Sequence, residues 1–182
     1  MPARLELELD IDNGPALDLA ARLKRPRLNW ALRSAINATL KNVTTRSAKD
    51  IREKSGIPSK KVKASLRPRK ATNGNLSATL TGYGKPLSLK EFKTRRTKAG
   101  VVAKIWGDKQ TFKKAFAAPS LGEHIFQRVG KKRLPIKKLY GPGVAQTMGR
   151  PDVMEGLEDF ANERLRTNAL RELDRAVNGK KG

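Results

Sequence analysis

Few side chains in this sequence of 182 residues can carry out covalent chemistry, and most of its ionisable groups are cations. The sequence contains one histidine, His124, and no cysteine, which excludes thiol catalysis, disulfide bonds and cysteine-bound zinc. A lone histidine within a predicted strand, with no carboxylate placed to orient it, is more often structural than catalytic. We therefore predict no catalytic residue and expect that the protein is not an enzyme.

Two further patterns were considered as ligand sites, and neither has the required spacing. Gly82-Tyr83-Gly84-Lys85 is similar to a phosphate-binding loop, but it lacks the Gly-x4-Gly-Lys-Ser/Thr spacing and no clear helix follows it. The acids between residues 21 and 150 are too scattered to gather on a hard cation, and those of Asp152–Asp159 fit the start of a helix. We predict neither a metal site nor a cofactor.

Charge is the strongest signal in the composition. The formal net charge is +23, and residues 21–150 hold 33 basic but only five acidic groups. Such a region must face a polyanion, an acidic protein or water, because its self-repulsion opposes compaction. The candidate contacts to DNA or to an acidic partner are Lys60, Lys61, Lys63, Lys93, Arg95, Arg96 and Lys98.

Residues 128–143 combine basic and apolar side chains with prolines that disfavour an interior helix or a central strand. The stretch is consistent with a solvated connector, and equally with a preformed extended arm that docks on a partner. In the second interpretation the candidate subunit-interface residues are Arg128, Arg133, Leu134, Pro135, Ile136, Leu139, Tyr140, Gly141 and Pro142.

Hydrophobic periodicity predicts the elements around these residues. Apolar residues three and four positions apart predict a long helix over 27–54, which Gly56 and Pro58 would end, and a second long helix after Asp152. Alternating apolar residues predict strands. Those expected are an acidic-faced strand at 5–11, a basic one at 61–67, a returning strand at 76–80, one at 100–106, and a hairpin formed by 115–118 and 124–129.

These elements predict an α+β fold in one domain, residues 1–182. A small, curved, mostly antiparallel sheet would pack on the long helix of the N-terminal half and on the C-terminal helix. The first strand could pair with the strand at 61–67, in its own chain or in a neighbouring one. The expected segments are a strand or arm at 1–12, helices at 13–56, a β-rich body at 57–130 with a mobile basic loop at 83–100, an extended Pro/Gly arm at 131–150 and a helix at 151–178.

Several short motifs, taken in order, resemble the phage minor tail protein Z, or tail completion, family. The most distinctive are Arg133-Leu134-Pro135-Ile136 and Leu139-Tyr140-Gly141-Pro142, after which Gly143 stands where the family pattern has Ser. The others are Ser55-Gly56-Ile57-Pro58, Lys60-Lys61-Val62-Lys63, Pro86-Leu87-Ser88-Leu89, Gly100-Val101, Lys114-Ala115-Phe116-Ala117 and Ile125-Phe126-Gln127-Arg128.

The resemblance implies a structural protein of the virion of a long-tailed phage. It would complete the head-proximal end of the tail and join it to the head connector, as part of a ring around the DNA channel. Its partners would be copies of itself, tail terminator or tail tube proteins, head connector proteins and the DNA in the channel. It would reside at the tail–head junction, and in the host cytoplasm during assembly.

Two alternatives remain open at this point. The first is a basic nucleic-acid-binding protein without sequence specificity, since no base-reading motif is present and binding would depend steeply on salt. The second is a ribosome-associated basic protein, which fits the composition but not the acidic first strand. The first residues do not form a signal peptide, and no apolar run is long enough for a transmembrane helix, so no membrane partner is expected.

Overall fold

The computed structural model describes residues 1–7 and 15–179, and the chain divides into two compact units. Unit 1 comprises residues 1–3, 48–66 and 82–150. Unit 2 comprises residues 4–47, 67–81 and 151–182. The continuation of the first strand beyond Leu7, expected as far as residue 11, lies outside the described residues.

Unit 2 is built from helices whose apolar residues recur every three or four positions. Helix α1 spans Pro15–Ala21, α2 spans Arg25–Ser55 and α5 spans Pro151–Asn178. The fully or nearly fully buried apolar residues of α2 within this unit are Ala31, Leu32, Ala35, Ile36, Leu40 and Val43. Those of α5 are Val153, Leu157, Ala161, Leu165, Ala169 and Leu173. Both long helices predicted from this periodicity are confirmed.

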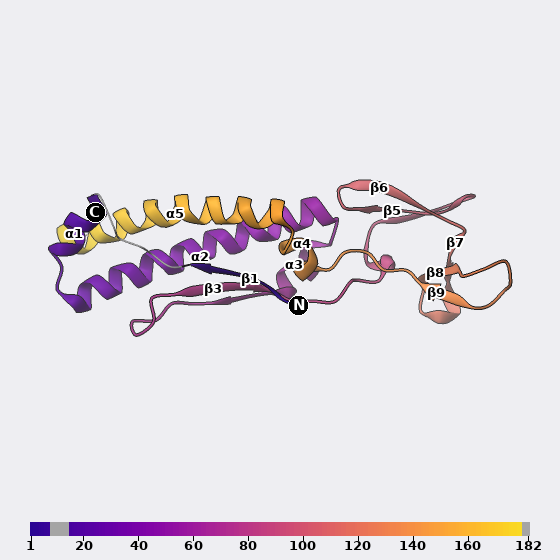
Figure 1. Cartoon of the computed structure of the whole chain (residues 1–182), viewed down its shortest axis with the longest axis horizontal. Helices are drawn as coiled ribbons and strands as arrows, with labels where there is room; N and C mark the ends of the chain where they lie inside the picture. The colour runs from indigo at the N-terminus through magenta and orange to yellow at the C-terminus, as the bar shows by residue number, and fades with distance from the viewer. Residues whose placement is uncertain (8–14, 180–182) are drawn as a thin grey trace. The chain divides into compact units, whose positions relative to one another are not determined.

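Helices α2 and α5 run antiparallel, side by side (Figure 1). Asn168 Nδ2 donates a buried hydrogen bond of 2.9 Å to Thr39 Oγ1. Towards the other end of α5, the Arg46 guanidinium lies 5.3 Å from the centre of the Phe160 ring. Leu32 and Leu173 belong to one buried cluster. Residues later in α2 contact residues earlier in α5, as expected for antiparallel helices. The apolar stripes of the two helices therefore pack against each other.

A three-stranded sheet completes unit 2, in the order β1-β3-β2. Its strands are β1 (Ala3–Leu7), β2 (Leu66–Arg69) and β3 (Ala78–Gly82). Burial alternates along β1, as the period-2 pattern predicts, with Leu5 and Leu7 inside and Glu6 outside. Within the described chain, the first strand does not pair with the strand expected at 61–67, because β1 lies beside β3. Its pairing with a neighbouring chain stays a prediction.

The strand expected at 61–67 is a helix for most of its length. Helix α3 spans Ser59–Ser65, and β2 begins only at Leu66. Val62 and Leu66 are buried, whereas Ala64 between them is exposed. In helix α3, residues two positions apart point in different directions, so Val62 is buried and Ala64 is exposed, whereas a strand would have placed both on one face. The alternation seen in the sequence was therefore a helical pattern read with the wrong period.

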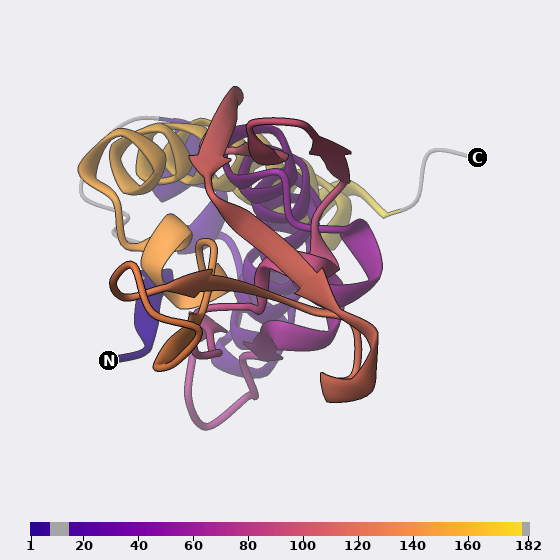
Figure 2. The same ribbon diagram turned by 90° about the vertical axis from the view of Figure 1, so that its right-hand side faces the viewer.

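Unit 1 contains two further antiparallel sheets, whose strands can be followed by their pink to orange colours in Figure 2. One has the order β4-β5-β6, formed by Thr94–Thr97, Gly100–Ile105 and Asp108–Lys113. The other has the order β7-β8-β9, formed by Ala115–Ala118, His124–Arg128 and Ile136–Lys138. The short helices besides α3 are η1 (Leu89–Glu91), η2 (Pro119–Leu121) and α4 (Val144–Met148).

The α+β class is confirmed, although the strands form three small sheets rather than one. The hairpin predicted at 115–118 and 124–129 is present as β7 and β8. The segment 83–100, expected to be a mobile loop, contains η1 and β4, and the segment 131–150, expected to be an extended arm, contains β9 and α4. Whether the chain acts as one domain stays a prediction.

Gly56 ends α2 as its position predicts. Its φ of +77° lies in the left-handed region, and a Cβ there would collide with the backbone carbonyl oxygen of Lys104 in β5. Glycine therefore stops the helix and lets β5 approach, and Trp106 N donates to Ser55 O at 3.3 Å next to this point.

Candidate functional site

The apolar and basic side chains predicted to form an interface lie around the connection between β8 and β9. Arg128 at the end of β8 pairs with Ile136 at the start of β9. Val129 N donates to Pro135 O at 3.1 Å, and Arg128 Nη1 donates to Arg133 O at 2.7 Å. The intervening residues, 129–135, which we term the β8–β9 loop, are thus closed by hydrogen bonds at their base rather than forming a free arm.

Large apolar groups face solvent on this hairpin. Leu134 is 65% exposed, Val129 62% and Tyr140, two residues after β9, 55%. Pro135 and Arg133 are exposed as well, while Ile136 and Leu139 are half-buried. Scattered exposed apolar residues are common, but several on one short hairpin mark a contact surface.

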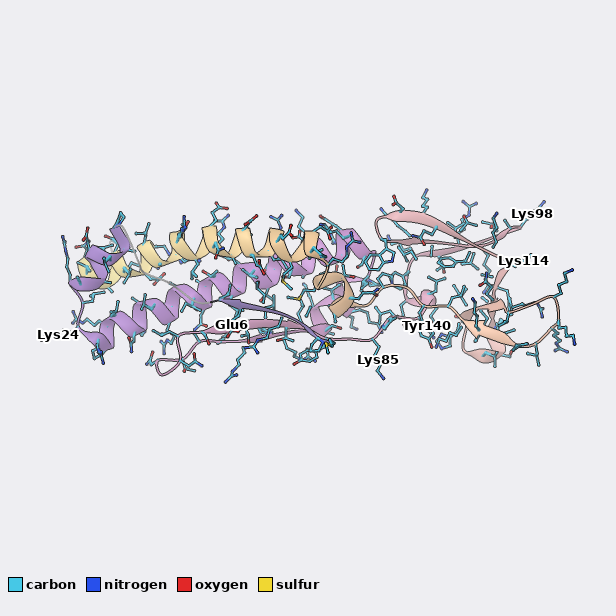
Figure 3. The ribbon with its side chains drawn as sticks, viewed as in Figure 1. Glu6, Lys24, Lys85, Lys98, Lys114 and Tyr140 are labelled. Atoms are coloured by element: carbon cyan, nitrogen blue, oxygen red, sulfur yellow. The ribbon has the colours of Figure 1, made fainter. Side chains whose placement is uncertain are left out.

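Two cations are held against aromatic rings on the same hairpin. The Arg128 guanidinium lies 5.3 Å from the centre of the Phe116 ring, and the Lys138 ammonium lies 5.5 Å from that of Tyr140. Figure 3 shows the ring of Tyr140 among the side chains of this unit. Cation–π contacts of this kind limit the freedom of both partners, so less conformational entropy remains to be lost on binding.

Gly141 and Pro142 occupy a different environment from the exposed residues before them. Pro142 is buried, and Gly141 N donates to Leu87 O at 2.8 Å. A Cβ on Gly141 would lie 2.7 Å from Cε2 of Phe92. The turn therefore packs within unit 1, and the candidate interface narrows to the exposed residues from 128 to 140.

His124 links three segments of unit 1. Lys138 Nζ lies 3.0 Å from His124 Nε2, and Ser88 Oγ lies 3.0 Å from Nδ1. Because an ammonium group can only donate, Nε2 must accept, which assigns the proton to Nδ1 and makes Ser88 Oγ its acceptor. Burial, followed by the charges of Lys138 and Lys90, lowers the pKa of His124, while Glu91 opposes this shift.

This arrangement does not form an activated nucleophile. A serine is activated when a histidine accepts its proton and a third group orients the histidine. Here the nitrogen facing Ser88 carries the proton, and the other nitrogen is occupied by a cation. The two contacts of His124 hold Ser88, β8 and β9 together. Their geometry does not support an acid–base function.

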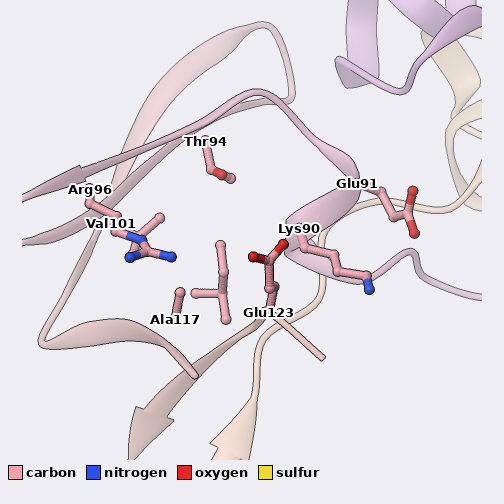
Figure 4. A pocket seen from close by; sticks show the side chains of 8 residues that line it. Lys90, Glu91, Thr94, Arg96, Val101, Ala117 and Glu123 are labelled. Carbon is pink, nitrogen blue, oxygen red and sulfur yellow. The ribbon is translucent and has the colours of Figure 1, made fainter. Parts of the chain in front are cut away.

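A polar hollow of about 350 Å³ lies beside these residues (Figure 4). The side chain of Glu123 stands between those of Arg96 and Lys90 in this view. The remaining lining residues are Glu91, Thr94, Val101, Ala117 and Ile125. Two acids balance two bases, so the hollow does not select an anion, and no group of three or more potential metal ligands occurs within residues 1–7 and 15–179.

The basic residues predicted to contact DNA or an acidic partner do not form one surface. Lys60, Lys61 and Lys63 lie on α3, where Lys61 Nζ is 3.5 Å from Glu91 Oε2. Lys93, Arg95 and Lys98 are exposed at or beside β4. Arg96 points to the opposite face of β4 from Arg95 and lines the polar hollow.

Sequence reasoning missed Lys104, Lys109 and Lys113, which extend the surface of Lys93 and Arg95 across the sheet. Strand register places them there, because Lys104 pairs with Lys109 and Lys113 lies opposite Gly100. The signal that could have found them is the alternation of buried and exposed residues along 100–105, in which Lys104 is exposed between two buried residues. Their partners in β6 could not be identified without the register.

The comparison with known families identifies the family of the chain. The sequence model of the prophage minor tail protein Z family matches residues 15–179 of the 182 in the chain. The chain belongs to this family. Its match to the minor tail protein Z family covers all the elements described above except β1, and the family assigns it a structural role in a phage tail, in the virion and among other virion proteins.

No curated protein and no solved structure matched the chain. Within the described part of the chain, no helix is both long and apolar enough to cross a membrane. The family match is thus the finding that carries the structural role, and the geometry of the two units must supply its detail.

Proposed function

We propose that this protein completes the head-proximal end of a phage tail and joins it to the head connector, as part of a ring around the DNA channel. The observation that carries the proposal is the exposed apolar group of Val129, Leu134 and Tyr140 on a hairpin closed by hydrogen bonds. Exposing these groups is unfavourable in an isolated chain and favourable once a partner covers them.

The side-chain types suit an interface between folded proteins. Apolar and aromatic anchors with arginine dominate the energetics of protein interfaces, and Arg128 and Arg133 flank the apolar group here. In this proposal the hairpin docks on a different part of a neighbouring copy. Such a head-to-tail contact forms a ring when its rotation closes and an open filament when it does not. The other partners proposed are tail terminator or tail tube proteins and head connector proteins.

Truncating the apolar anchors tests the proposal. In Leu134→Ser/Tyr140→Ser the fold should persist, because both side chains are exposed, and tails should fail to join heads. The matched control is Leu121→Ser/Tyr83→Ser, which removes the same two residue types, each 50% exposed, from elsewhere in unit 1. It should assemble normally.

Electron microscopy of complemented particles would count tails joined to heads, and density for this protein should appear at the head-proximal end of the tail. Normal joining and infectivity in the first variant would refute the role of the hairpin. Density at the distal end of the tail would refute the proposed location.

A further inference from the structure

One face of the β4-β5-β6 sheet carries five cations and no acid. Paired residues of antiparallel strands share a face, as do residues two positions apart. The register pairs Arg95 with Val102 and Val102 with Thr111, and it pairs Lys104 with Lys109. Lys104 N also donates to Lys93 O, which continues the register beyond β4. The charged residues of this face, here called the basic sheet face, are Lys93, Arg95, Lys104, Lys109 and Lys113.

The opposite face of the same sheet is covered by protein. Val101, Ala103 and Ile105 are buried, whereas Lys104 is exposed. Asp108, the acid of β6, pairs with Ile105 and so lies on the covered side. Along β5, the sheet therefore has one buried apolar side and one exposed side that carries Lys104.

Three lysines lie in one row across the basic sheet face. Lys93, Lys104 and Lys109 are cross-strand neighbours, and Cβ atoms of directly opposed residues are ~4.5–5.5 Å apart. Like charges in this position destabilise a sheet. Among residues 1–7 and 15–179, none of the five cations forms an ion pair through its side chain. No close ion pair among the described residues therefore offsets their repulsion.

We propose that the basic sheet face binds the phosphate backbone of duplex DNA. Thr111 shares the face with the cations, and hydroxyl groups together with Lys and Arg are the donors that contact phosphates. The inference deepens the proposed function, because it assigns the DNA of the channel to a particular surface.

The composition of the face favours nucleic acid over an acidic protein. A protein interface needs an apolar or aromatic anchor at its centre, and the basic sheet face offers only the half-buried Val102. Phe112, the aromatic residue of β6, pairs with Val101 and thus lies on the covered side. Without an aromatic platform for bases, the face contacts the backbone and does not distinguish sequences.

Neutralising part of the face tests the inference on the purified full-length protein. The variant is Lys104→Gln/Lys109→Gln/Lys113→Gln. The matched control is Lys49→Gln/Lys85→Gln/Lys114→Gln, which removes the same charge from exposed lysines of unit 1 outside the face. Fluorescence anisotropy with a mixed-sequence 20-base-pair duplex is measured across a range of salt concentrations.

The face variant should bind roughly tenfold or more weakly at 0.1 M salt, and the slope of log K against log salt should flatten by about 2 to 3, close to 0.9 per lost phosphate contact. The control should keep the wild-type slope. Lys104→Gln alone should flatten the slope by about 1, which provides a readout if the triple variant does not fold.

Three outcomes would overturn the inference. They are equal losses in the face and control variants, an unchanged slope in the face variant, or tighter binding of poly-glutamate than of the duplex at equal charge concentration. This assay does not depend on where the protein lies in a particle. Failure of DNA binding would leave the hairpin-mediated joining intact, and DNA binding by a protein found away from the head-proximal end would refute only the proposed function.

Discussion

The two units of this protein use charge in opposite ways. Unit 1 carries 23 basic and five acidic residues, whereas unit 2 carries 17 and 12. In unit 2 the buried Glu172 accepts hydrogen bonds from Arg171 and Arg175, both at 3.1 Å. In unit 1 the basic sheet face sets lysines beside one another without a counterion. The contrast indicates that unit 2 is optimised for stability and unit 1 for binding.

The two units also differ in where particular apolar side chains lie. Unit 2 buries the apolar stripes of two long helices against each other. Unit 1 leaves Val129, Leu134 and Tyr140 exposed on one hairpin. Since exposed apolar area is a cost to an isolated chain, this hairpin is the part of unit 1 expected to gain most from a partner that covers it.

The largest effect is expected in the core of unit 2. Leu173 is fully buried in the cluster with Ala31 and Leu32. Leu173→Ala removes buried methyl groups and leaves a cavity, which should lower the free energy of unfolding by ~2–5 kcal/mol. Leu170→Ala on the same helix, where the side chain is 39% exposed, should cost far less. Denaturant unfolding followed by circular dichroism would measure both, and equal losses would contradict the assignment of this core.

A smaller loss is expected from neutralising the buried carboxylate of unit 2. Glu172→Gln keeps the side-chain shape but weakens two charge-assisted hydrogen bonds. Because both arginine partners are about half exposed, the expected loss is about 1–2 kcal/mol. The same unfolding measurement would check it, with Glu163→Gln as an exposed control on α5. An unchanged midpoint would show that these pairs do not stabilise unit 2.

The smallest expected effect is a gain in stability rather than a loss. Lys104→Gln removes one member of the lysine row and should stabilise the chain by ~0.2–1 kcal/mol at low salt. The gain should shrink as salt screens the repulsion. Unfolding midpoints at 20 mM and 500 mM salt would show this. A destabilised variant would mean that other groups already offset the charge repulsion at Lys104. The two units would then no longer differ in how they use charge.

Sequence patterns identified the elements that bury one face and missed those that bury none. The spacing of apolar residues predicted α2 and α5, and alternation predicted β5, β7 and β8. All four residues of β4 are exposed, and β6 has only Phe112 half-buried, so neither carries a hydrophobic period. Their pairing with β5 fixes these strands, and such pairing is not visible in a single sequence.

The candidate surfaces show the same limit. The exposed positions of Leu134 and Tyr140 were predictable, because apolar residues beside a run of cations and prolines cannot enter a core strand. The internal role of Gly141 was not, since Phe92, which it contacts, lies 49 positions earlier in the chain. The lysine row likewise arises only when 93, 104 and 109 are brought into register.

The path of the chain has a consequence for how the protein is made. Leu173, near the end of α5, completes a cluster whose other members lie near residues 20 to 32. A polypeptide still emerging from the ribosome therefore cannot close unit 2 until its last helix is released. A fragment cut short before α5 would retain every surface residue of unit 1 but lack a completed scaffold. Such products should be removed by proteolysis before they reach a growing particle, which leaves full-length copies for assembly.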